Sequence, residues 1–134
     1  MAAPRQAERP LSPHLQIYRV TITMAMSIIH RITGFGLYLG TALLAWWLIA
    51  AATGPDAYAV FLGVAASWFG KLVLFGFTWA LIHHLLSGIR YLFWDEIKGF
   101  DLKTADAMSW LAAIGGLALT VLVWVAAIVL RGGL

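Results

Sequence analysis

Hydrophobic residues gather in three long runs that are separated by short polar segments. The runs cover residues 27–52, 68–94 and 107–130, and each has about the ~20 residues that a membrane-spanning helix needs. A shorter apolar stretch, residues 57–67, follows the turn sequence Gly54-Pro55-Asp56 and is expected at the membrane surface. The pattern predicts an all-α membrane protein with three transmembrane helices, organised as one domain over residues 1–134.

The segment before the first run is polar. Residues 1–20 contain Pro4, Pro10 and Pro13, which interrupt regular helix, so we expect an extended arm on the cytoplasmic surface. Its composition alone favours disorder, and the lack of an apolar core before Thr21 argues against a signal peptide. The charged segment 96–106 is expected to be a loop.

Composition and charge narrow the possible functions. The chain is 62% hydrophobic and 11% charged, which is far from the composition of a soluble protein. It contains no cysteine, so disulfides and thiolate-bound metal clusters are excluded, and a net charge of +3 gives no indication of nucleic-acid binding. With three spans, the arm and the second loop lie on the same side of the membrane. This side carries most of the positive charge outside the spans: Arg5, Arg9, Arg19, Lys98 and Lys103. The positive-inside rule therefore predicts a cytoplasmic N-terminus, or a matrix one in a mitochondrion.

Two adjacent histidines, His83 and His84, lie inside the second run. An imidazole near the middle of a bilayer is costly, so a functional role is the default expectation. A hydrogen bond between helices, a proton relay and metal ligation are all compatible with the position alone.

The neighbours of the two histidines differ. Small residues flank His84 at spacings of four, which leaves a bare ridge on which a flat macrocycle can stand: Gly76, Ala80 and Gly88. The ridge of His83 instead includes Trp79 and Ser87. Of the two, His84 is therefore the better candidate for a haem ligand, and we expect His83 to contact a neighbouring helix or the edge of the pocket. Neither of the other histidines, His14 and His30, is expected near the midplane. A six-coordinate haem would then take its second axial ligand from another chain.

A second polar group precedes the apolar core of the first run. Ser27, His30, Arg31 and Gly34 share one face if this stretch is helical. Arg31 at a membrane edge can simply reach lipid phosphates. Alternatively, Ser27 and Arg31 are two donors that can hold the carbonyl oxygens of a quinone, where Arg31 would stabilise developing negative charge. His30 can then contact a haem propionate or take part in proton delivery.

Three motifs resemble one family, the cytochrome b556 subunits that serve as membrane anchors of succinate dehydrogenase. They are R-P-L-S-P-H-L-Q-I-Y-R at residues 9–19, S-I-I-H-R-I-T-G at 27–34 and H-x-x-x-G-I-R at 84–90, the last followed by Trp94-Asp95. The resemblance implies a three-helix anchor that forms half of a helical bundle, completed by a second small membrane anchor. It also implies an arm that is ordered against the cytoplasmic side of the complex.

The resemblance further implies a respiratory complex II in the cell inner membrane, with a flavoprotein and an iron–sulfur subunit as partners. One haem b would be shared between the two anchors, with His84 as one axial ligand. Ser27 and Arg31 would line the ubiquinone site, where ubiquinone is reduced in two one-electron steps. The chain alone would not be catalytic.

One position departs from the family pattern. Many members read G-I-R-H, whereas this chain has Tyr91 after Gly88-Ile89-Arg90, so Tyr91 replaces an imidazole that could contact a propionate. Two other interpretations remain: a structural anchor without haem, and the anchor of a quinol:fumarate reductase, because the motifs do not fix the direction of electron flow.

Overall fold

The computed structural model describes residues 13, 16–130 and 132. It contains α1 (Ile22–Thr53), α2 (Pro55–Ala66), α3 (Trp68–Asp95) and α4 (Leu102–Leu130), and no strand occurs within these described residues. Helices α1, α3 and α4 are long and apolar enough to cross a membrane, whereas α2 is too short. The predicted fold class is confirmed. Most of the arm, residues 1–12 and 14–15, lies outside the described part of the chain.

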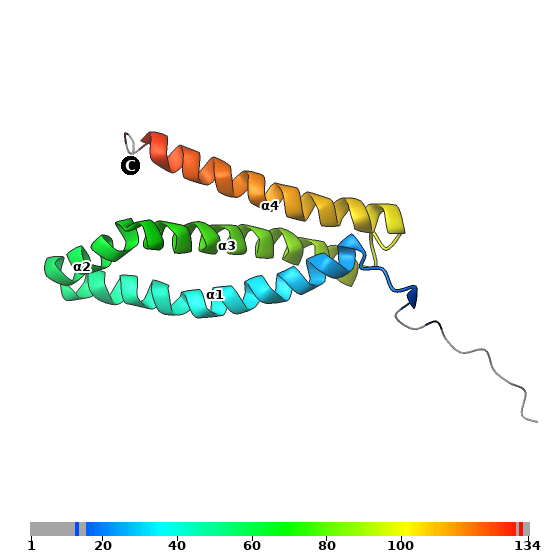
Figure 1. The fold of residues 1–134 in the computed structure, drawn as a ribbon, viewed down its shortest axis with the longest axis horizontal. Coiled ribbons are helices and arrows are strands. Elements are labelled where there is room, and N and C mark those ends of the chain that lie inside the picture. The colour runs from blue at the N-terminus through cyan, green and yellow to red at the C-terminus, as the bar shows by residue number, and fades with distance from the viewer. Residues whose placement is uncertain (1–12, 14–15, 131, 133–134) are drawn as a thin grey trace, which may run out of the picture.

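The three long helices lie side by side, with α3 between α1 and α4 (Figure 1). Helix α2 connects α1 to α3 at one end of the bundle, and residues 96–101 connect α3 to α4 at the other end. The start of α1 lies near this second loop, while the end of α4 lies at the α2 end (Figure 1). Helix α4 diverges from α3 toward its C-terminal end, and its buried residues extend only as far as Thr120.

Two helices begin earlier than the hydropathy pattern predicts. Helix α1 starts at Ile22 because the Thr21 side chain accepts a hydrogen bond from the Met24 N–H and caps the first turn. Helix α4 starts at Leu102, where Asp101 accepts a hydrogen bond from the Thr104 N–H at 2.9 Å. Polar residues at a helix start satisfy free N–H groups, so the helix extends beyond its apolar core. The expectation of a loop over residues 96–106 was wrong for its second half.

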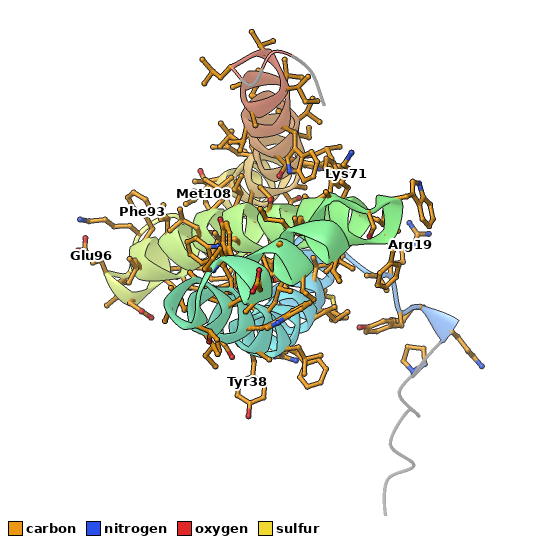
Figure 2. The ribbon with its side chains drawn as sticks, turned by 90° about the vertical axis from the view of Figure 1, so that its left-hand side faces the viewer. Arg19, Tyr38, Lys71, Phe93, Glu96 and Met108 are labelled. Carbon is orange, nitrogen blue, oxygen red and sulfur yellow. The ribbon has the colours of Figure 1, made fainter. Side chains whose placement is uncertain are left out.

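The distribution of side chains is the reverse of a soluble protein. Large hydrophobic residues point outward along all three long helices, as Tyr38 and Phe93 do in Figure 2. The largest fully buried side chains are polar: Arg90, His83, Thr120, Ser87 and Ser109. Lipid tails are as apolar as a protein core, so in a bilayer it is polar groups and close-packed small residues that hold helices together.

Candidate functional site

His84 is held by its Nδ1 atom against α1. Nδ1 lies 3.2 Å from the His30 carbonyl oxygen and 3.2 Å from the Thr33 hydroxyl oxygen. A carbonyl oxygen can only accept, so Nδ1 carries the proton and donates it. In a neutral imidazole this leaves the Nε2 lone pair free, and Nε2 forms no hydrogen bond within the described residues. This is the tautomer in which a histidine coordinates a metal through Nε2.

The His30 side chain covers one face of the His84 ring. The two ring centroids are 3.8 Å apart and the planes differ by 13°. The Tyr91 ring lies 5.1 Å from His30 in a tilted arrangement, so three of the predicted site residues gather between α1 and α3. We expected His30 at the membrane edge and well away from His84, but the structure brings the two rings together. His30 lies about 12 Å into α1, which begins at Ile22.

Glycines shape the surface around His84. A Cβ atom added at Gly34 would lie 3.0 Å from His84 Cε1, so only glycine lets α1 approach the ring this closely. On α3, a Cβ atom added at Gly76 or Gly88 would touch nothing within 4 Å. The predicted ridge therefore borders open space at both glycines, whereas Ala80, one turn before His84, is buried.

An open apolar hollow of about 280 Å³ lies between α1 and α3, one turn from His84. Its lining is made of small and aliphatic residues and one aromatic ring: Gly36, Leu39, Gly40, Leu43, Val73, Gly76, Phe77 and Ala80. A flat apolar group that approaches His84 Nε2 along this face would meet small side chains.

His83 faces the opposite helix. Only 1% of it is exposed, its Nε2 lies 3.3 Å from the Ser87 hydroxyl, and its ring stacks on Trp79 at 5.4 Å. A Cβ atom added at Gly116 of α4 would lie 3.3 Å from His83 Cα. His83 is thus enclosed at the contact between α3 and α4, away from the His84 cluster.

Ser27 and Arg31 lie on α1 on either side of His30 in the sequence. Ser27 is half-buried and Arg31 is exposed. None of the contacts that join His30, His84 and Tyr91 includes either side chain. The structure therefore leaves both available to a molecule outside this chain.

Two buried residues near the site were missed from the sequence. Thr33, only 2% exposed, bonds to both His30 and His84. Arg90, 1% exposed, donates from NH1 to the Ser109 hydroxyl, while its guanidinium carbon lies 4.7 Å from the Trp94 ring centre. The signal for Arg90 was its spacing of seven from His83, which places both on the α4 face. Thr33 gave no such signal, because its role depends on the register between α1 and α3.

No group of three or more His, Cys, Asp or Glu side chains gathers within the residues that the structure describes. A bare metal ion therefore finds no complete ligand set in this part of the chain. A haem iron differs because its porphyrin supplies four nitrogens and the protein supplies only axial ligands. A single histidine with a free Nε2 beside open space fits one half of such a site.

Comparison with known proteins points to the same kind of protein. A family model described as succinate dehydrogenase/fumarate reductase transmembrane subunit matches residues 5–123. The chain belongs to this family. It is 44% identical over 122 residues to the succinate dehydrogenase cytochrome b556 subunit of Paracoccus denitrificans, covering 91% of this chain and 94% of the relative.

More distant relatives carry similar names. The Rickettsia felis succinate dehydrogenase cytochrome b556 subunit is 38% identical over 118 residues, which are 88% of this chain and 92% of the relative. The mitochondrial succinate dehydrogenase cytochrome b560 subunit of Mus musculus is 34% identical over 121 residues, which are 87% of this chain and 68% of the relative. The resemblance to succinate dehydrogenase cytochrome b subunits is confirmed, and the chain is a multi-pass membrane protein of that family.

Proposed function

We propose that this chain is the haem b-binding membrane anchor of a succinate:ubiquinone oxidoreductase. The proposal is supported by family membership together with the tautomer of His84, in which Nδ1 carries the proton and Nε2 can bind a metal. The observation that carries it is the 3.2 Å contact between His84 Nδ1 and the His30 carbonyl oxygen. Histidines that ligate metals characteristically donate their second ring N–H to an acceptor of this kind, which fixes the tautomer and the ring orientation.

In this proposal His84 Nε2 would bind the iron of a single haem b. A second small membrane anchor would supply the other histidine that holds this haem. His30 does not fill that role, because its ring lies parallel against the His84 ring. When bound, the haem supplies one-electron chemistry. His30 and Tyr91 then lie where they can contact the haem edge or its propionates, with His83 behind the pocket.

Ser27 and Arg31 form this chain's part of the ubiquinone site. The Arg31 guanidinium is exposed, so it can donate to a quinone carbonyl and stabilise the negative charge that develops there during reduction. The Ser27 hydroxyl, one helical turn away, offers a second donor on the half-buried side. Both residues orient the head of the quinone, and its apolar tail extends into lipid.

The proposed assembly includes an iron–sulfur subunit and a flavoprotein on the side of the arm and of residues 96–101. The concentration of arginine and lysine on this side favours the cytoplasm, or the matrix in a mitochondrion. The membrane would be the cell inner membrane. The other side of the bundle carries Lys71 near the start of α3.

The haem assignment is tested on the purified complex by a reduced-minus-oxidised spectrum. We expect a b-type band in the unmodified complex and at least a tenfold loss of haem in His84→Leu, because the ligand is removed. His83→Leu is the matched control and should retain the band. Absence of the band from the unmodified complex would favour a structural anchor without haem. Loss in His83→Leu but not in His84→Leu would overturn the ligand assignment.

The quinone assignment is tested separately. Ser27→Ala and Arg31→Gln should each lower succinate:ubiquinone activity at least tenfold, because each removes a donor to a quinone oxygen. Succinate oxidation with an artificial soluble acceptor should be unchanged, which shows that the soluble subunits are intact. Full quinone reduction in both variants would limit these residues to the membrane edge.

A further inference from the structure

Thr33 makes two hydrogen bonds at the contact between α1 and α3. Its hydroxyl donates to the His30 carbonyl oxygen at 2.9 Å, and its oxygen lies 3.2 Å from His84 Nδ1. Nδ1 also lies 3.2 Å from the same His30 carbonyl. Thr33, the His30 carbonyl and the His84 ring thus form a closed triangle in which Thr33 is 2% exposed.

The proton positions in this triangle follow from its atoms. The His30 oxygen has two lone pairs and accepts from both partners. The Thr33 hydroxyl has one proton, which the carbonyl receives, so a lone pair on Thr33 Oγ1 faces Nδ1–H. The single Nδ1 proton is therefore shared between two acceptors, and donation by the hydroxyl makes its own oxygen a better acceptor.

We propose that Thr33 is a positioning residue that sets the orientation and the electron-donating strength of His84 toward the haem iron; this inference rests on the proposed function. An acceptor at Nδ1–H makes an imidazole more basic, and a more basic ligand stabilises ferric iron over ferrous iron. Thr33 therefore lowers the haem midpoint potential. The branched side chain, stiff at χ1, and the close contact of Gly34 with His84 Cε1 keep the ring at one angle.

A threonine in a membrane helix can also have no role beyond a hydrogen bond within its own helix. Its hydroxyl often bonds to a carbonyl one turn back without further consequence. Thr41 of α1 shows this case: it donates to the Tyr38 carbonyl at 2.6 Å, is exposed, and has no histidine among its hydrogen-bond partners in the described residues. Thr41→Val is therefore a matched control, since it removes the same kind of intrahelical bond and nothing else.

The experiment uses the assembled complex with Thr33→Val, Thr33→Ser or Thr41→Val. A redox titration of the b-type band gives the midpoint potential, and haem per complex is measured in the same samples. Thr33→Val should shift the ratio of reduced to oxidised haem about threefold toward the reduced form, a rise of about 30 mV for a one-electron couple. Thr33→Ser should restore the unmodified potential because it keeps the hydroxyl, and Thr41→Val should leave it unchanged.

Three results would overturn the inference. The first is a potential in Thr33→Val that equals that of Thr41→Val. The second is an equal shift in Thr33→Ser, because the hydroxyl would then have no role. The third is a complex without a b-type band before any substitution, which would overturn the proposed function as well. If Thr33→Val does not accumulate, Thr33→Ala removes the same acceptor with less bulk, and the same comparison with Thr33→Ser decides.

Discussion

The contacts on the two sides of α3 use adjacent histidines in opposite ways. On the α1 side, His84 Nε2 has no hydrogen-bond partner among the described residues, and glycines with open space and an apolar hollow lie nearby. On the α4 side, His83 and Ser87 are enclosed, and Arg90 is bonded to Ser109. On the α4 side the buried polar groups are enclosed, whereas on the α1 side the buried Thr33 hydroxyl contacts a histidine that is only half-buried. Burial of a polar group in a membrane protein is therefore a weaker sign of function than a polar group with one side left open.

The largest effects on the two contacts of α3 are expected from substitutions at two glycines, Gly88 and Gly116. Gly88→Leu should preserve the amount of anchor in the membrane, because a Cβ atom there meets nothing within 4 Å, but should lower haem per complex at least tenfold by filling the strip beside His84. Gly116→Leu should instead lower the amount of anchor in the membrane, while the anchor that remains keeps its haem. A Cβ atom at Gly116 lies 3.3 Å from His83, so a larger side chain forces α4 from α3 at a cost of about 1–3 kcal/mol.

Immunoblots of membranes and haem content per anchor distinguish the two effects. Gly63→Leu on α2, where a Cβ atom also meets open space, should change neither quantity. Full haem occupancy in Gly88→Leu would show that the macrocycle does not use this strip.

A smaller effect is expected at the bond between α3 and α4. Ser109→Ala removes the acceptor of the buried Arg90 guanidinium, and we expect a loss of about 0.6–1.7 kcal/mol in stability. Thr120→Val is the control, since within the described part of the chain the Thr120 hydroxyl bonds only to the Gly116 carbonyl of its own helix. Thermal unfolding of the complex in detergent measures both. Equal losses of stability in the two variants would show that packing, and not the Arg90–Ser109 hydrogen bond, stabilises the contact between α3 and α4.

The smallest effect is expected at the start of α4. Hydrogen bonds from Thr104 lower the pKa of Asp101 below its ordinary value. A lowered carboxyl pKa contributes stability that is present above the unfolded-state pKa and is lost as pH falls through the folded-state value. Unfolding midpoints should therefore be slightly lower for Asp101→Asn than for the unmodified protein at neutral pH, and the two should converge in acid. A difference that persists in acid would mean that the carboxylate charge is not its cause.

The features that could be predicted from the sequence are those that depend on a single helix. Hydropathy located three spans, and the spacing of small residues around His84 separated it from His83. The sequence did not reveal the contact between His30 and His84, because that contact depends on how α1 packs against α3. It also missed Thr33 and the enclosure of Arg90, which depend on the register between helices. That register is set by close contacts such as Gly34 on His84, and no periodicity within one helix reports it.

The distance in sequence between His30 and His84 has a consequence for synthesis of the chain. The two residues that share a hydrogen bond are 54 positions apart, so ribosomes making 5–20 residues per second need roughly 3–10 seconds to go from one to the other. During this interval α3 is incomplete, so α1 has no partner helix on this side. The bond from Thr33 to the His30 carbonyl lies within α1 and can form at once. It keeps the hydroxyl satisfied until α3 is inserted, and under the proposed function haem would be loaded only after that.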